Sequence, residues 1–168
     1  MDTSQLKKCG VGVQLNEFTK ICKPEVVEIG HYTKLCDFVF IWGGKGVKIG
    51  KYCDFQPQVT IWGGGELLIG NYVSVGPGTV LLTAVYSHKE GLRMVDRLPE
   101  GQAHALYQKL IIEDDVYIGA NCTVMPGITI REGSLIGANS FTNKDTEPWS
   151  INAGSPSKKI GVRPQLKI

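Results

Sequence analysis

The chain has 168 residues, 42% of them hydrophobic, and a formal net charge of +2. Its length suits one domain with a continuous core over residues 1–168, and its small charge argues against nucleic acid or an anionic membrane as the main partner. Because residues 1–10 lack an apolar run and no stretch of about 18 apolar residues occurs, we predict a cytoplasmic protein without membrane insertion.

Residues 9–82 repeat every twenty positions, marked by Cys9-Gly10, Ile29-Gly30, Ile49-Gly50 and Ile69-Gly70. Further apolar residues follow each mark at six and twelve positions: Leu15 and Ile21, Leu35 and Ile41, Phe55 and Ile61, Val75 and Leu81. A spacing of six fits neither a helix nor one continuous strand, so it predicts short strands separated by corners, three to a triangular coil. Each coil then carries a two-residue bulge, for which recurring glycine pairs provide backbone freedom.

Trp42 and Trp62 precede these glycine pairs in successive coils. The spacing therefore stacks the two indoles at one corner. Such an aromatic pair is suited to a carbohydrate platform, and it is equally suited to covering the glycine-rich bulge or to a contact between subunits. The sequence leaves these interpretations open.

The six-residue register stops over residues 83–111. An insertion of this length in a compact solenoid is typically functional or disordered. We predict an extended loop, with a short helix over residues 100–110. Its polar residues include Tyr86, Ser87, His88, Arg93, Asp96, Arg97 and His104.

The period returns over residues 112–145. The large inward residues are Ile112, Ile118, Val124, Ile130 and Ile136, and a smaller set follows four positions after each: Val116, Cys122, Ile128, Ser134 and Ser140. Together with the earlier coils, this pattern predicts an all-β solenoid of about six triangular coils. A C-terminal tail rich in turn residues follows over residues 146–168.

Several motifs resemble those of the hexapeptide-repeat acyltransferases: Ile118-Gly119-Ala120-Asn121-Cys122-Thr123, Val124-Met125-Pro126-Gly127-Ile128-Thr129, Ile136-Gly137-Ala138-Asn139-Ser140-Phe141 and Ala153-Gly154-Ser155-Pro156-Ser157-Lys158. The chain resembles sugar O- and N-acetyltransferases such as the galactoside and maltose acetyltransferases. The resemblance implies a left-handed parallel β-helix, a homotrimer and acetyl-CoA as co-substrate, without a metal. It also implies a sugar or nucleotide-linked sugar acceptor, in surface-polysaccharide or amino-sugar metabolism.

The resemblance further implies a histidine general base near the extended loop. His88 follows the last regular coil before this loop, at the matching place. A hydroxyl that attacks a thioester must lose its proton, which imidazole can accept near neutral pH. His104 is the alternative base. The backbone N–H near Ala120 is the expected donor to the oxyanion, although a small residue required at a tight corner explains Ala120 equally well.

The coenzyme A residues are assigned by motif position. Ala138 is expected along the pantetheine, Lys144 near the phosphates, and Pro156 and Lys158 near the adenine end. Further cations in the tail, Lys159 and Arg163, are available for the 3′-phosphate and pyrophosphate. The alternative interpretation is a solvated basic tail.

A triangular solenoid is also compatible with other functions. A γ-class carbonic anhydrase needs three histidines on adjacent coils, whereas this chain has three in all and none after residue 112. The five cysteines form no CxxC pair, which argues against a zinc site or a disulfide framework, and inward Cys53 and Cys122 are interpreted as packed thiols. An acetyltransferase acting on a small antibiotic or other xenobiotic, and a non-catalytic scaffold, remain open alternatives.

Overall fold

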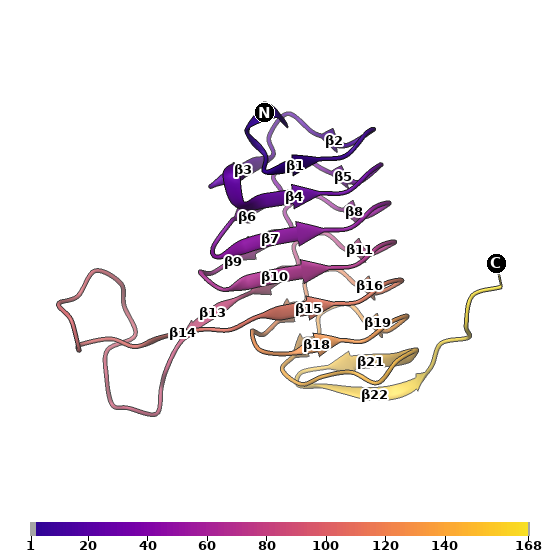
Figure 1. Ribbon diagram of the computed structural model, residues 1–168. Coiled ribbons are helices and arrows are strands. Elements are labelled where there is room, and N and C mark those ends of the chain that lie inside the picture. Colours follow the sequence, from indigo (N-terminus) through magenta and orange to yellow (C-terminus); the bar gives the residue numbers. More distant parts are fainter. Residues whose placement is uncertain (1–2, 168) are drawn as a thin grey trace.

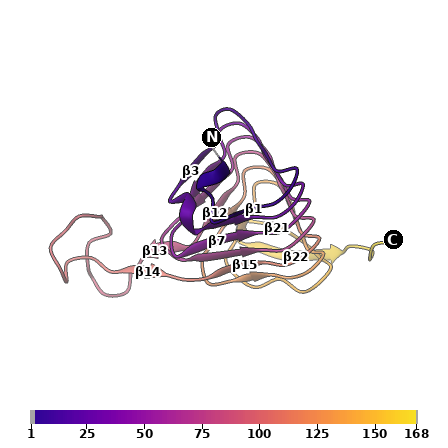
Figure 2. The same cartoon turned by 45° about the horizontal axis from the view of Figure 1, so that its top comes forward.

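The computed structural model describes residues 3–167 and shows a triangular prism of stacked coils (Figures 1 and 2). Three sheets of parallel coil strands form its faces. The first sheet contains β1 (Lys8–Cys9), β4 (Val27–Ile29), β7 (Gly46–Ile49), β10 (Glu66–Ile69), β15 (Leu110–Ile112) and β18 (Thr129–Ile130). The second contains β2 (Gln14–Leu15), β5 (Lys34–Leu35), β8 (Asp54–Phe55), β11 (Ser74–Val75), β16 (Tyr117–Ile118), β19 (Leu135–Ile136), β21 (Ser150–Gly154) and β22 (Ser157–Val162). The third contains β3 (Lys20–Cys22), β6 (Phe40–Trp42), β9 (Thr60–Trp62), β12 (Val80–Leu82), β17 (Thr123–Val124) and β20 (Phe141–Thr142).

Each coil contributes one strand to every face, so neighbouring strands pair in parallel with partners one coil away. Ile29 pairs with Ile49, and Ile49 in turn pairs with Ile69, as the twenty-residue period requires. The predicted all-β, left-handed parallel β-helix is confirmed. The first and third sheets have six strands each, and β21 begins a further turn on the second face, so the solenoid is slightly longer than predicted.

The prism axis is filled by the inward residues that the period identifies. The large set from Ile112 to Ile136 and the smaller set from Val116 to Ser140 are all buried. At the N-terminal end, Cys9 is exposed and Leu15 is half-buried. The reason is that the first coil has a neighbour on only one side, and a repeat buries its core only against the next.

We name the corners by the sheets they join: the first corner joins the first sheet to the second, the second corner joins the second to the third, and the third corner joins the third to the next coil's first. At the first corner, Tyr32, Tyr52 and Tyr72 form an exposed ladder with ring centroids 5.2 and 5.4 Å apart. Two 3-10 turns, η1 (Thr3–Gln5) and η2 (Pro24–Val26), complete the N-terminal part.

The predicted helix over residues 100–110 is wrong. An antiparallel ribbon forms instead, with β13 (Ala84–Tyr86) paired to β14 (Ala105–Tyr107), and β15 begins at Leu110. The physical reason is that Leu106 and its neighbours find backbone partners on β13, while Leu110 is already an inward residue of the next coil. The ribbon projects from the third corner, away from the prism (Figures 1 and 2).

The segment predicted as a tail over residues 146–168 is a regular hairpin up to Val162. Strand β21 pairs in parallel with β19, and β22 folds back to pair with β21 in the antiparallel direction. The hairpin covers the open end of the solenoid (Figure 1). Among residues 3–167, no helix is both long enough and apolar enough to cross a membrane.

Candidate active site

The ribbon at the third corner carries both candidate bases. The Ser87 N–H donates to the His104 carbonyl oxygen at 2.8 Å, so the strand pairing continues one step beyond β13 and β14. His88 comes next and is exposed; within residues 3–167 its imidazole forms no hydrogen bond or ion pair. His104 Nδ1 lies 2.6 Å from Glu90 Oε2. A carboxylate at Nδ1 orients an imidazole and leaves Nε2 to accept a proton.

A second group of predicted residues meets at the C-terminal end of the coil. A cavity of about 460 Å³ is lined there by Lys144, Pro156 and Lys158, together with Asn143 and Asn152. The structure therefore brings together three of the four residues assigned to coenzyme A by motif position. Lys144 and Lys158 are exposed, and neither forms an ion pair within the part of the chain that the structure describes.

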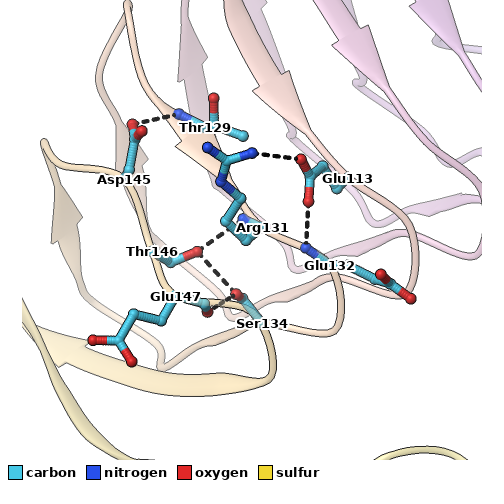
Figure 3. A network of polar contacts seen from close by, with 8 residues as sticks. All are labelled: Glu113, Thr129, Arg131, Glu132, Ser134, Asp145, Thr146 and Glu147. Carbon is cyan, nitrogen blue, oxygen red and sulfur yellow. Dashed lines mark hydrogen bonds and ion pairs between the residues drawn. The ribbon is translucent and has the colours of Figure 1, made fainter.

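A polar network holds the segment that contains Lys144 (Figure 3). The Asp145 carboxylate accepts a hydrogen bond from the Thr129 N–H at 2.8 Å, and the Thr146 hydroxyl accepts one from the Arg131 N–H at 2.8 Å. Thr146 also bonds to the Ser134 hydroxyl at 2.8 Å, inside the coil. These contacts fix the backbone directly after Lys144, so the Lys144 side chain is attached to a well-ordered segment.

The network extends along the first sheet through Glu113. Its carboxylate pairs with the Arg131 guanidinium at 3.0 Å and accepts a hydrogen bond from the Glu132 N–H at 2.8 Å (Figure 3). Ser134 also donates to the Glu147 carbonyl oxygen at 3.0 Å. The last two coils and the segment that follows them are thereby tied into one unit.

The hairpin turn that carries Pro156 is tied to the last coil. The Gly154 N–H donates to the Ser140 hydroxyl oxygen, and the Ser157 hydroxyl donates to the Thr142 hydroxyl oxygen, both at 3.1 Å. Two of the tail cations have structural partners. Lys159 pairs with Glu147, and the Arg163 guanidinium donates to two backbone carbonyl oxygens and lies 5.6 Å from the Trp149 ring centroid.

Ala120 and Ala138 lie one above the other at the second corner. The Asn139 N–H donates to the Ala120 carbonyl oxygen at 2.8 Å, while the Ala120 N–H donates to no acceptor within residues 3–167. A Cβ on Gly119 would approach the Ala138 nitrogen to 2.6 Å, so this corner is also tightly packed. Both interpretations of Ala120, a free donor and a small corner residue, agree with this geometry.

The described chain does not join all the predicted residues in one place. Ala120 and Ala138 are at the second corner, whereas the ribbon histidines and Lys144 are at the third. About five residues of extended strand separate the two corners, which is roughly 15 Å. One chain thus presents the predicted site residues in two separate groups on different edges, and we call these groups the two partial sites.

The buried cysteines are not arranged as nucleophiles. Burial raises the pKa of the Cys53 and Cys122 thiols above their ordinary value, which keeps them neutral near pH 7. Within residues 3–167, no three His, Cys, Asp or Glu side chains are grouped so that they could hold a metal ion.

Sequence reasoning missed one pocket at the third corner. It has a volume of about 550 Å³ and lies between Trp42, Trp62 and the root of the ribbon. The indoles were visible in the sequence, but Lys23 and Tyr107 also line the pocket and were not identified. Only the pairing of β13 with β14, across a long stretch of chain, brings Tyr107 to this place.

Comparison with known proteins supports the repeat. A family model described as the hexapeptide repeat of succinyl-transferase matches residues 109–143. Chloramphenicol acetyltransferase from Klebsiella aerogenes is 49% identical over 53 residues, which are 32% of this chain and 25% of that protein. A probable macrolide acetyltransferase from Lysinibacillus sphaericus is also 49% identical over 53 residues, covering 32% of this chain and 29% of that protein. The matched part thus spans about a quarter of the length of these curated relatives.

Solved structures match nearly the whole chain. A mutant of AntD, an N-acyltransferase from Bacillus cereus solved with dTDP-4-amino-4,6-dideoxyglucose and coenzyme A, is 25% identical, with a TM-score of 0.89 over 96% of this chain and 87% of that one. A hexapeptide-repeat acetyltransferase from Vibrio cholerae, solved with acetyl coenzyme A, shares the fold at 22% identity, with a TM-score of 0.67 over 96% of this chain and 74% of that one. The triangular coil, the family-model match, the acetyltransferase relatives and the AntD-like fold together support a hexapeptide-repeat acetyltransferase.

Proposed function

We propose that the protein is a cytoplasmic acetyltransferase that moves an acetyl group from acetyl-CoA to a hydroxyl or amino group of a sugar or nucleotide-linked sugar. Surface-polysaccharide or amino-sugar metabolism is the proposed setting. The observation that carries the proposal is the cavity where Lys144, Pro156 and Lys158 meet. Motif position alone predicts these three residues, and their convergence supports one ligand that contacts all of them.

Coenzyme A suits this cavity chemically. Its phosphates carry negative charge, which the ammonium groups of Lys144 and Lys158, unpaired within residues 3–167, can neutralise as point charges. Pro156 would pack against the adenine end, and Ala138, at the second corner, would lie along the pantetheine. The Ala120 N–H, which has no acceptor in the described chain, would donate to the oxyanion of the tetrahedral intermediate.

The acceptor attacks the thioester directly, and His88 takes its proton as general base. Its position after the last regular coil supports this role, and its exposure leaves the imidazole accessible. His104 is the competing base, because its contact with Glu90 gives it the oriented geometry of a catalytic imidazole. A covalent acyl-enzyme is not needed, and the neutral, buried Cys53 and Cys122 thiols agree with direct attack.

The proposed assembly is a homotrimer with active sites between chains. The ribbon projects from the third corner (Figure 1). In a trimer it would extend to the second corner of a neighbouring chain and so bring the two partial sites together. The ribbon histidines would then face the Ala120 and Ala138 corner of the neighbouring chain.

A small antibiotic is the second candidate acceptor, and the similarity to chloramphenicol acetyltransferase favours it. That similarity covers only 32% of this chain. Acceptor contacts come mainly from loops and insertions, which differ between members of one fold. An assay that includes chloramphenicol beside nucleotide-linked amino sugars distinguishes the two candidates.

Coenzyme A binding tests the donor half of the proposal. A ligand that binds only the folded state stabilises it by RT ln(1 + [L]/Kd), so a concentration of 100 times Kd adds about 2.7 kcal/mol. We expect coenzyme A to raise the melting temperature, and Lys144→Ala and Lys158→Ala to weaken this shift. Lys51→Ala, an exposed lysine at the first corner, is the matched control. A non-catalytic scaffold would show no shift at all.

Replacement of each histidine tests the chemical step. His88→Ala should lower kcat by roughly 10² to 10⁴ with a hydroxyl acceptor and leave coenzyme A affinity within about threefold. A base acts in the transition state, so kcat and kcat/KM should fall together. A neutral amine attacks before it loses its proton, so a smaller loss would indicate N-transfer. The measurement is steady-state acetylation against pH, with coenzyme A affinity from calorimetry. A larger loss in His104→Ala than in His88→Ala, with the fold intact, would assign the base to His104.

A further inference from the structure

The pocket between the paired tryptophans and the root of the ribbon is separate from the cavity assigned to coenzyme A. Both lie along the third corner, but Lys144 follows the sixth strand of the third sheet, whereas the pocket opens beside the second and third. Its volume of about 550 Å³ falls in the range of small-molecule sites, roughly 300 to 1,000 Å³. Its lining includes Lys23, Trp42, Lys45, Trp62, Tyr86, Asp96 and Tyr107.

The indoles provide a stacking surface. Trp42 and Trp62 lie with ring centroids 5.6 Å apart and planes tilted by 47°, and Phe40 supports Trp62 from the coil at 5.8 Å. Trp62 nevertheless leaves 51% of its surface exposed. If the indole only covered the glycine-rich bulge, most of that surface would be buried. Tyr107, 55% exposed, adds a further aromatic ring to the pocket lining.

Glycines create the space between these rings. A Cβ on Gly64 would come within 2.4 Å of the Tyr107 ring, and a Cβ on Gly63 would come within 2.5 Å of the Ala84 nitrogen at the ribbon root. Gly63 also has a φ of 125°, which L side chains rarely adopt. The corner is therefore built to bring the ribbon close to the indoles without filling the pocket.

Charged groups of both signs surround the aromatic surface. Lys23 holds its ammonium group 5.7 Å from the Trp42 ring centroid, and Lys45, at the next bulge, is exposed at the pocket. Asp96, in the loop between β13 and β14, lines the same space. An aromatic ring beside two cations suits a ligand that is planar at one end and anionic at the other, and a neutral sugar needs no such cations.

We propose that this pocket binds the nucleoside diphosphate part of the acceptor. The base stacks on Trp62, the pyrophosphate faces Lys23 and Lys45, and Asp96 accepts hydrogen bonds from sugar hydroxyls. The inference rests on the proposed function, because it specifies which end of a nucleotide-linked sugar is held. The strands that line the pocket, β13 and β14, lead directly to His88 and His104, so the reacting sugar would extend towards the proposed base.

Tryptophan fluorescence can measure this binding. The chain has three tryptophans, and Trp149 packs at the far end of the coil beside Gly133. In a Trp149→Phe background, the remaining emission comes from Trp42 and Trp62. The probes are thymidine diphosphate, thymidine, inorganic pyrophosphate and chloramphenicol, and calorimetry with thymidine diphosphate gives affinities that do not depend on the emission.

We expect thymidine diphosphate to quench the emission in a saturable way and more strongly than thymidine or pyrophosphate. Trp62→Ala should weaken its calorimetric affinity about tenfold or more, since stacking on one aromatic ring contributes about 1–3 kcal/mol. Lys45→Gln should weaken the binding of thymidine diphosphate but not the binding of thymidine. Tyr52→Ala, an exposed ring of the first corner, and Lys48→Gln, an exposed lysine on β7, are the matched controls and should change neither affinity.

Failure of this inference can be told apart from failure of the proposed function. Suppose that coenzyme A binds and acetyl transfer occurs, but thymidine diphosphate gives no saturable signal or binds Trp62→Ala with unchanged affinity. The pocket assignment is then wrong, while the proposed acetyltransferase activity is supported. Saturable quenching by chloramphenicol alone would also overturn the inference. If thymidine diphosphate binds as expected and no acceptor is acetylated, the assignment of the pocket is supported and the proposed acetyltransferase activity is contradicted. A retained coenzyme A melting shift in each variant shows that its fold is intact.

Discussion

At the scale of single residues, position in the coil decides the chemistry of each side chain. Cys53 and Cys122 sit at the smaller inward positions, where each thiol donates to a backbone carbonyl oxygen at 3.2 Å, that of Gly70 for Cys53 and that of Gly137 for Cys122. Burial raises the pKa of both thiols. Cys9 has the same functional group but is exposed.

These buried thiols should make stability depend on alkaline pH. In the unfolded chain a thiol ionises near pH 8.5, whereas the folded thiols keep their protons until their raised pKa is reached. Their contribution to the free energy of unfolding is therefore fully present below about pH 8.5 and is lost as the pH rises through the folded pKa. We therefore expect the free energy of unfolding, measured with urea from pH 7 to 10, to fall less steeply in the double variant Cys53→Ala, Cys122→Ala than in the wild type. Cys9→Ala is the control and should keep the wild-type slope.

Charge introduced on the axis should unfold the coil. Ile118 is fully buried in β16, so Ile118→Asp places a carboxylate without a partner where several kcal/mol are needed to accommodate it. Lys51→Asp changes an exposed residue whose main contact is with the Tyr72 ring at 5.9 Å, which contributes about 1 kcal/mol at most. Soluble yield and thermal unfolding measure both variants. Equal loss in the two would mean that the inward register is misassigned.

At the scale of elements, the hairpin of β21 and β22 completes the solenoid. It pairs with β19 and is pinned by Trp149, whose ring lies against Gly133. The Arg163 guanidinium donates to the Gly133 carbonyl oxygen at 3.1 Å and also contacts the indole. Because the hairpin turn lines the proposed coenzyme A cavity, its attachment to the coil matters for function as well as for stability.

Gly133→Ala should release this attachment. A Cβ there would come within 2.4 Å of the Trp149 ring, and the φ of 66° adds strain, so we expect a loss of about 1–3 kcal/mol and weaker coenzyme A binding. Gly91→Ala is the matched control, with a φ of 63° and nothing within 4 Å of its Cβ. Gly91→Ala should lose only the part of the free energy of unfolding that backbone strain removes. Chemical unfolding and calorimetry compare the two variants, and equal effects would mean that the Trp149 contact contributes nothing.

At the scale of the whole molecule, the two partial sites at different corners support a shared site between chains. Light scattering should give three times the chain mass of 18.3 kDa. A monomer at micromolar concentration would contradict the proposed trimer.

Mixing of inactive variants tests the shared site directly. His88→Ala lacks the proposed base at the third corner, and Ala138→Phe blocks the proposed pantetheine contact at the second corner, where Ala138 is exposed, so each homotrimer should be weakly active. If one chain supplies the base and its neighbour binds coenzyme A, trimers formed by refolding the two variants together should regain part of the wild-type activity. The matched control is each variant refolded alone. No recovery on mixing would assign both residues to one chain.

The sequence alone determined the coil, because the inward register repeats locally and every coil obeys the same spacing. It also predicts that Lys144, Pro156 and Lys158 contact coenzyme A, since each sits in a recognisable motif, and the three line one cavity. The tertiary structure decided what no period encodes. Residues far apart in the chain pair there: β13 with β14 in place of a helix, and Arg163 with the Asp115 carbonyl oxygen. Such contacts depend on which segments the stacked coils bring together, and a local pattern carries no record of that proximity.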